Sequence, residues 1–390
     1  MFRAYKYRIS PTNSQKELIA KHIGSSRFVY NLALETKTTA YLGSKHNFSP
    51  FDLIKQLPEL KKECEWLKEV NSQSLQQSIQ NMDIAFKKFF KGAGFPKYKS
   101  KHKGNQSFSI PQNVIVENNL LIIPKFKEGI DIVLHRKIKG TIKSATISVT
   151  PTGKYFVSIL VDTNTEIPIK APITENTTIG IDLGIKDFAI TSDGEVFENP
   201  KYLRKAQSKL KYVQRKYSKH KGKRTKNKLA KLHEKVVNKR KDFLHKVSTK
   251  LIRENQTIAL ETLSVKNMVK NHNLAQAIND VSWSTFVTML EYKAEWYGKN
   301  ILKIGRFEPS SKLHANCGHI NKDLTLKDRE WVCPKCGEVV SRDLNAAINI
   351  KSFALKNILS GTDRKNQDEL LTLVKVLTPE AQPIGSAVGG

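Results

Sequence analysis

A chain of 390 residues is long enough for two or three domains that each bury a core. Its 66 Lys and Arg exceed its 36 Asp and Glu, so the formal net charge is +30, which excludes a near-neutral surface and suits a polyanionic partner. No apolar run approaches the ~20 residues that span a bilayer, and the N-terminus lacks the apolar core of a signal peptide, so we expect a soluble protein of the cytoplasm or nucleoid, without membrane partners.

The first ninety residues predict one strand and then helices. Residues 1–10 alternate in polarity as a short strand does, and Pro11-Thr12-Asn13-Ser14 offers a helix start. Residues 14–92 read as a helical region. Its clearest piece is an apolar stripe with spacings of three and four, typical of one packed helix face: Leu75, Ile79, Met82, Phe86 and Phe89.

A basic, glycine-rich loop follows at residues 93–106, with the sequence GAGFPKYKSKHKGN. Such a loop can lie along a phosphate backbone and stack its two aromatic rings on bases, or it can be a solvated linker. Residues 107–162 then change to strands, with Asn118-Asn119 and Pro151-Thr152-Gly153 as hairpin turns. Since residues 1–10 could join these strands, we predict one β unit interrupted by a helical insertion.

A second unit is expected after the polar, proline-containing stretch 163–176. TIGIDLGIKDFAITSDGEVF predicts two strands and a turn, with a further hairpin signal at Asp193-Gly194. Residues 201–250 hold 20 Lys and Arg against only Glu234 and Asp242, on a thin apolar stripe. They predict two helices with a cationic outer face, which favours contact with nucleic acid over a merely solvated surface.

The remaining core elements are shorter. QTIAL at 256–260 predicts a buried strand, 280–298 an amphipathic helix, and 301–304 another strand. The end of the chain, 359–390, is polar and then rich in small residues, and we expect a flexible tail.

Three of the four cysteines cluster late in the chain, which favours a metal site over disulfides in a reducing compartment. Cys333-Pro-Lys-Cys336-Gly is a knuckle that turns two thiolates toward one ion, and Cys317 supplies a third. His314 stands where a cysteine would complete a C-x2-C pair, so it is the predicted fourth ligand, with His319 as competitor. A knuckle that has lost its metal is the alternative. Cys64 is isolated in the sequence, and we expect its side chain to be an ordinary packed thiol.

Three carboxylates stand at costly positions. Asp182 lies inside an apolar strand, Glu261 ends another, and Asp343 starts the helix of RDLNAAINI. A buried, unpaired charge is expensive, and a divalent ion compensates it. Two Mg²⁺ ions held by such carboxylates can activate water and relieve charge in phosphodiester hydrolysis. For Asp343 alone, stabilisation by the helix dipole is an equally good explanation.

GIDLGIKDFA, ALETL, CPKCG and RDLNAAINI occur here in the order found in the TnpB (OrfB) proteins of bacterial insertion sequences. The N-terminal segments FRAYKYRISPTNSQKELI, RFVYNLALE and GFPKYKSKHKGNQSF also resemble that family, so the likeness covers roughly residues 1–355.

The resemblance implies a multidomain α+β fold with an RNase H-like (RuvC) nuclease core, related to the ancestors of type V CRISPR effectors. By this likeness a β-barrel wedge domain comprises 1–10 and 107–165, and a helical recognition domain 11–106. The nuclease core comprises 175–310 and 340–358, and a zinc ribbon is inserted at 311–339.

It further implies a guide RNA made from the transposon end, and cleavage of matching double-stranded DNA beside a short adjacent motif. Asp182, Glu261 and Asp343 would then carry the Mg²⁺-dependent triad, and Zn²⁺ would be structural. The chain departs from the family at His314, usually cysteine, and at Thr262, often aspartate. A guide-directed DNA-binding repressor, or a transposase that joins strands, is the alternative function. The oligomeric state stays open.

Overall fold

The computed structural model describes residues 1–102, 106–325 and 327–359. The chain divides into two compact units, one of residues 1–166 and one that begins at Ile167. Among the described residues, no helix is both long and apolar enough to cross a bilayer. The predicted tail at 359–390 lies outside the described residues except for Leu359.

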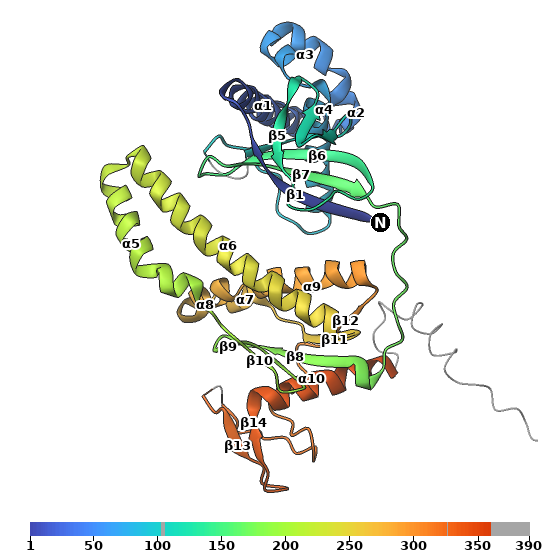
Figure 1. The fold of residues 1–390 in the computed structure, drawn as a ribbon, viewed down its shortest axis with the longest axis vertical. Coiled ribbons are helices and arrows are strands. Elements are labelled where there is room, and N and C mark those ends of the chain that lie inside the picture. Colours follow the sequence, from blue (N-terminus) through green and yellow to red (C-terminus); the bar gives the residue numbers. More distant parts are fainter. Residues whose placement is uncertain (103–105, 326, 360–390) are drawn as a thin grey trace, which may run out of the picture. The chain divides into compact units, whose positions relative to one another are not determined.

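The first unit holds a seven-stranded antiparallel sheet in the order β2-β6-β7-β1-β5-β4-β3 (Figure 1). The N-terminal strand lies in its middle, paired with β7 and β5, which confirms that residues 1–10 join the later strands. The two expected hairpin turns are present, with positive φ at Asn118, Asn119 and Gly153. The strands are β1 (Phe2–Ser10), β2 (Gln106–Ile110), β3 (Ile115–Glu117), β4 (Leu120–Ile123), β5 (Phe126–Val133), β6 (Thr141–Val149) and β7 (Tyr155–Asp162).

This sheet has two edges. Within the described residues, β2 and β3 end the ladder and no pairing joins them. The closed barrel expected from the family resemblance therefore stays a prediction. Alternating residues of β1, such as Tyr7 and Ile9, are buried, and they share a core with Ile19 and Ile23 of the first helix.

Helices fill the rest of the first unit: α1 (Asn13–Ser44), α2 (Pro50–Lys55), α3 (Leu57–Glu63), the 3₁₀ turn η1 (Glu65–Glu69) and α4 (Ser72–Phe90). A capping box at Thr12 and Gln15 starts α1, where the sequence predicted a helix start. The stripe of α4 forms a second core with α1, and Leu75 and Met82 are fully buried. Cys64 packs at the border of this core as a free thiol.

The second unit is built on a five-stranded mixed sheet in the order β10-β9-β8-β11-β12. The strands β8, β9 and β10 form an antiparallel meander, whereas β11 runs parallel to both β8 and β12. Their bounds are β8 (Thr178–Leu183), β9 (Asp187–Thr191), β10 (Val196–Glu198), β11 (Thr257–Glu261) and β12 (Asn300–Ile304). The protein is thus a mixed α/β fold.

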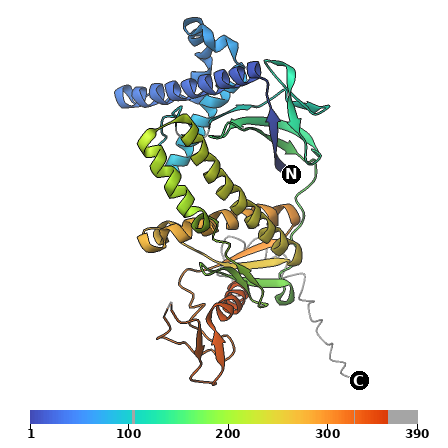
Figure 2. The ribbon, with the colours of Figure 1, turned by 60° about the vertical axis from the view of Figure 1, so that its left-hand side comes forward.

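Helices cover both faces of this sheet. One core joins it to α6 (Lys223–Glu254) and α9 (Trp283–Tyr297), and another joins β11 and β12 to α10 (Arg342–Leu359). The predicted basic pair is α5 (Tyr202–His220) and α6, which lie against each other as a hairpin (Figure 2). Two short helices, α7 (Val265–Met268) and α8 (His272–Val281), follow β11. The small pair β13 (Glu330–Val332) and β14 (Val339–Ser341) precedes α10.

Two charged side chains fasten the basic hairpin to the core. Lys293 of α9 is buried and donates to Ser248 Oγ and Thr249 Oγ1 of α6, each at 2.7 Å, and to a backbone carbonyl. Burial lowers the pKa of Lys293 to about 8. Asp280 of α8 accepts hydrogen bonds from the first amides of α5 and pairs with Arg240 of α6 at 2.7 Å.

Candidate active site and metal centre

Parallel pairing of two strands places Asp182 and Glu261 side by side. Ile181 of β8 is in register with Leu260 of β11, so the next step along both strands brings the two acids to neighbouring positions. The residues that precede them are buried, because both strands lie in the middle of the sheet and are covered on both faces. The side chains of Asp182 and Glu261 therefore lie next to each other at the C-terminal ends of β8 and β11.

Asp343 lies near these strand ends because the backbone of α10 passes very close to that of β8. Gly180 lies two residues before Asp182, and a Cβ at that position would come within 2.1 Å of the Ala347 carbonyl oxygen. Two strand residues span about 7 Å and four helix residues about 6 Å. A contact between Gly180 and Ala347 thus sets Asp343 near Asp182.

The charges of this trio act on one another. Burial, together with the nearby carboxylates of Asp343 and Glu261, raises the pKa of Asp182 to about 7, while Arg342 opposes this shift. Burial also raises the pKa of Glu261. A divalent cation would stabilise the ionised forms of Asp182 and Glu261, and an all-oxygen donor set suits Mg²⁺.

Asp343 is held by two arginines. Arg329 binds one carboxylate oxygen at 2.9 Å, and Arg342 binds the other at 2.7 Å. The backbone amide of Arg342 also donates to the carbonyl of Arg329. A metal ion at Asp343 would compete with these guanidinium groups for the carboxylate oxygens.

The buried carboxyl group predicts a pH dependence of stability. Asp182 titrates near 3.8 when exposed, but its pKa is about 7 in the folded protein, so the folded state favours the protonated form. The stability that Asp182 contributes is therefore complete below pH 3.8 and is lost as the pH rises through 7. Without Mg²⁺, Asp182→Asn should become more stable than the parent near neutral pH, measured by chemical unfolding at several pH values. A stability difference that does not change with pH would contradict this assignment.

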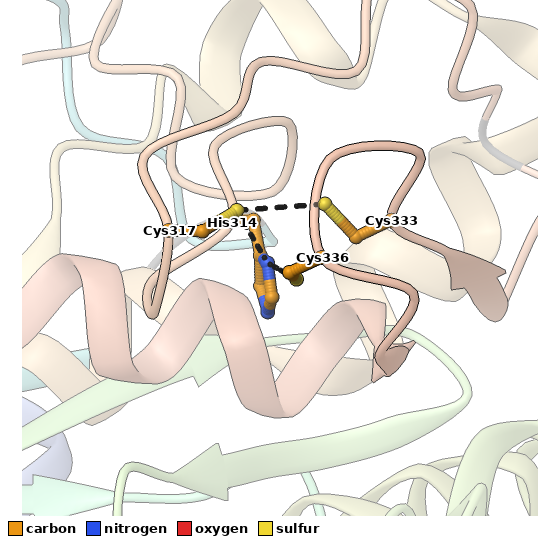
Figure 3. Close-up of side chains that lie close together, drawn as sticks. All are labelled: His314, Cys317, Cys333 and Cys336. Atoms are coloured by element: carbon orange, nitrogen blue, oxygen red, sulfur yellow. Dashed lines mark hydrogen bonds between the residues drawn. The ribbon is translucent and has the colours of Figure 1, made fainter.

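His314, Cys317, Cys333 and Cys336 form the second cluster, and their ligand atoms all lie within 4.8 Å of one another (Figure 3). His314 Nδ1 is 3.1 Å from Cys317 Sγ and 3.4 Å from Cys336 Sγ. One imidazole nitrogen and three sulfurs at this spacing fit a tetrahedral zinc ion. The cluster does not include His319, whose carbonyl accepts a hydrogen bond from the backbone amide of His314.

The knuckle around Cys333 favours thiolate. Burial acts to raise its pKa, but the backbone amides of Cys336 and Lys335 donate hydrogen bonds to the sulfur. Together with the neighbouring sulfurs of Cys317 and Cys336, they lower the pKa to about 6. Deprotonated sulfur is the form that binds zinc.

The zinc content of two histidine variants tests the fourth ligand. We expect His314→Ala to lose zinc and His319→Ala to keep it, because only His314 presents a ring nitrogen to the three sulfurs. Metal analysis of purified protein measures this directly. Equal zinc in both variants would mean that neither imidazole is required.

Two buried asparagines of α10, the helix that carries Asp343, bind the backbone of the loop around His314. Asn345 donates to the Leu313 carbonyl and accepts from the Ala315 amide at 2.9 Å. Asn349 donates to the carbonyls of Ser310 and Leu313. The candidate zinc cluster and the carboxylate trio therefore share one rigid element.

The two aromatic side chains of the basic loop contact residues of α1 and α4. The ring of Phe95 packs edge-on against Phe86 and Phe89, and the Tyr98 hydroxyl donates to Glu35 at 2.8 Å. Asn31 exchanges two hydrogen bonds with the backbone of residue 99. Phe95 and Tyr98 are nevertheless 48% and 56% exposed, so stacking on bases stays a prediction, as does phosphate contact by the lysines. Residues 103–105 lie outside the described part of the loop.

Several residues of the site escaped the sequence analysis. The sequence could have indicated Gly180, since a glycine inside a strand often marks a close approach of another backbone. It could also have indicated Asn345 and Asn349, which lie one turn apart on a buried helix face. Nothing in the sequence indicates Arg329, because only the fold brings it close to Asp343.

Comparisons with known proteins show which family the chain resembles. Family models match three parts of the chain: "Probable transposase" at 158–272, "Cas12f1-like, TNB domain" at 283–350 and "Helix-turn-helix domain" at 1–45. A "Putative RNA-guided DNA endonuclease" of Streptomyces pristinaespiralis is 39% identical over 378 residues, covering 94% of this chain and 93% of the relative. The Escherichia coli (strain K12) protein named "Putative RNA-guided DNA endonuclease InsQ" is 31% identical, covering 89% and 91%.

The chain belongs to the TnpB (OrfB) family. Over a shorter stretch, it is 32% identical to "TnpB-like protein L79" of Acanthamoeba polyphaga mimivirus, covering 33% of this chain and 25% of that protein. A solved structure titled "Cryo-EM structure of the Cas12f1-sgRNA-target DNA complex" is similar with a TM-score of 0.36 and 16% identity. The match covers 90% of this chain and 99% of that one.

Proposed function

We propose that the protein is an RNA-guided DNA endonuclease of a transposable element, which cleaves double-stranded DNA matched to a guide RNA beside a short adjacent motif. The observation that carries the proposal is the buried Asp182 beside Glu261 and Asp343, in a chain of net charge +30. Family membership supports it, because relatives that match nearly the full chain bear the name RNA-guided DNA endonuclease.

The residues would divide the work by position. Asp182, Glu261 and Asp343 would together hold the catalytic Mg²⁺ ions. When bound, these ions supply a water nucleophile and neutralise charge at the leaving oxygen. Arg342 and Arg329 would hold the Asp343 carboxylate in place through their ion pairs with it.

We further propose the family's domain roles for this chain. The meander followed by two parallel strands supports an RNase H-like (RuvC) core at 175–310 and 340–358. The ribbon at 311–339 would bind structural Zn²⁺. The sheet formed by residues 1–10 and 107–165 would be the wedge domain, and 11–106 the recognition domain.

Cleavage by the purified protein tests the function. Protein carrying its copurified guide RNA should cut matching DNA in Mg²⁺ and should not cut it in EDTA, because the carboxylates act through the metal. Sequencing that RNA identifies the target to be used. Tight, guide-dependent DNA binding without any cutting, under varied metals and temperatures, would favour the alternative of a DNA-binding repressor.

A further inference from the structure

One polar contact of His314 points away from the three sulfurs. While Nδ1 faces Cys317 and Cys336, Nε2 on the far side of the ring is 3.4 Å from Oε2 of Glu338. The His314 side chain is buried, whereas that of Glu338 is half exposed. A neutral imidazole that binds metal through Nδ1 carries its proton on Nε2, where this carboxylate can accept it.

Glu338 is itself held in place. Asn316 Nδ2 donates to both of its carboxylate oxygens, at 3.0 and 2.8 Å. Its carbonyl accepts from the Cys333 amide at 2.9 Å, and its own amide hydrogen-bonds the Cys336 sulfur. Glu338 therefore follows the Cys333–Cys336 knuckle in the chain, and its side chain contacts His314 and Asn316 in the loop that carries Cys317.

We propose that Glu338 is a positioning residue for the zinc centre, which fixes His314 as an Nδ1 ligand. The inference rests on the proposed zinc site and adds its outer partner. A carboxylate on the second nitrogen of a metal-binding histidine sets the tautomer, orients the ring and raises its basicity, and loss of such a partner typically weakens metal binding about 10–100-fold. A cysteine at position 314 would need no such partner, because a thiolate has no second nitrogen to orient.

A comparison of two backgrounds separates this role from simple bridging of the knuckles. Zinc affinity is measured with zinc alone against a competing chelator, on the full chain. Glu338→Ala should bind zinc about 10–100-fold more weakly than the parent. In a His314→Cys protein, which offers the normal four-cysteine set, the same substitution should change the affinity less than about threefold. Equal losses in both backgrounds would mean that Glu338 acts only by joining the knuckles, and would overturn the proposal.

Glu330→Ala is the matched control. Glu330 lies exposed at the start of β13 on the same ribbon, so its removal changes the charge equally without touching the cluster. We expect parent-like zinc affinity. A loss as large as that of Glu338→Ala would assign the effect to charge alone and would contradict the proposal.

A second measurement applies whether or not the cysteine variant folds. Nitrogen-15 NMR of the zinc-loaded parent should show the His314 ring bound through Nδ1, with a slowly exchanging proton on Nε2 that Glu338→Ala loses. Binding through Nε2 would overturn the inference. If the parent binds no zinc, the proposed zinc site fails as well. If the parent binds zinc and Glu338→Ala binds it equally tightly, only the role of Glu338 fails.

Discussion

Replacement of Asp182 by alanine is expected to abolish DNA cleavage while leaving guide RNA binding nearly unchanged. Burial and the nearby carboxylates of Asp343 and Glu261 raise the pKa of Asp182 to about 7. Without the Asp182 carboxylate, the proposed site would lose one of its three metal ligands. We expect a fall of at least roughly 10²–10³-fold, the scale seen when one group that stabilises developing charge is removed.

The same substitution should not lower the thermal stability of the metal-free protein, because a buried carboxyl surrounded by like charges costs free energy. Asp193→Ala is the control, since it removes an acid from the exposed turn after β9. That variant should cleave like the parent. Normal cleavage by Asp182→Ala would place the active site elsewhere, and loss of RNA binding would indicate misfolding rather than a catalytic defect.

The second large effect is expected at Gly180, which touches no substrate. An alanine Cβ there would lie 2.1 Å from the Ala347 carbonyl oxygen and 2.7 Å from the Lys351 amide nitrogen, both in the backbone of α10. Neither atom can rotate away, so α10 must shift from β8. We expect a loss of about 1–3 kcal/mol or more in stability, the usual cost of overpacking. Because Asp343 moves with the helix, cleavage should fall as well.

Gly24→Ala provides the comparison. Gly24 lies in α1, and a Cβ there would meet nothing within 4 Å. That variant should keep its activity and gain up to about 1 kcal/mol, because alanine is the better helix former. Urea unfolding and cleavage rates measure both variants. If Gly180→Ala cleaved DNA at the parent's rate, the short approach of α10 would not be what positions Asp343.

Local patterns in the sequence were sufficient for most elements. The alternation of residues 1–10, the stripe of α4 and the turns at Asn118-Asn119, Gly153 and Asp193-Gly194 all depend on near neighbours, and the structure contains each of them. The pairing of β1 with β7 could be inferred only loosely, since its partners lie about 150 residues away in the chain.

The sequence by itself determined which residues are proposed to carry the chemistry: three acids at costly positions, and a histidine with three cysteines at metal-ligand spacing. Only the tertiary structure decided how they meet. Parallel pairing of β8 and β11 places Asp182 beside Glu261, and the missing side chain of Gly180 lets α10 bring Asp343 close. Arg329, the partner of Asp343, and Glu338, the partner of His314, could not be predicted from the sequence, because each is separated from its partner along the chain. A hydrogen bond or an ion pair depends on distance in space, which spacing along the chain does not specify.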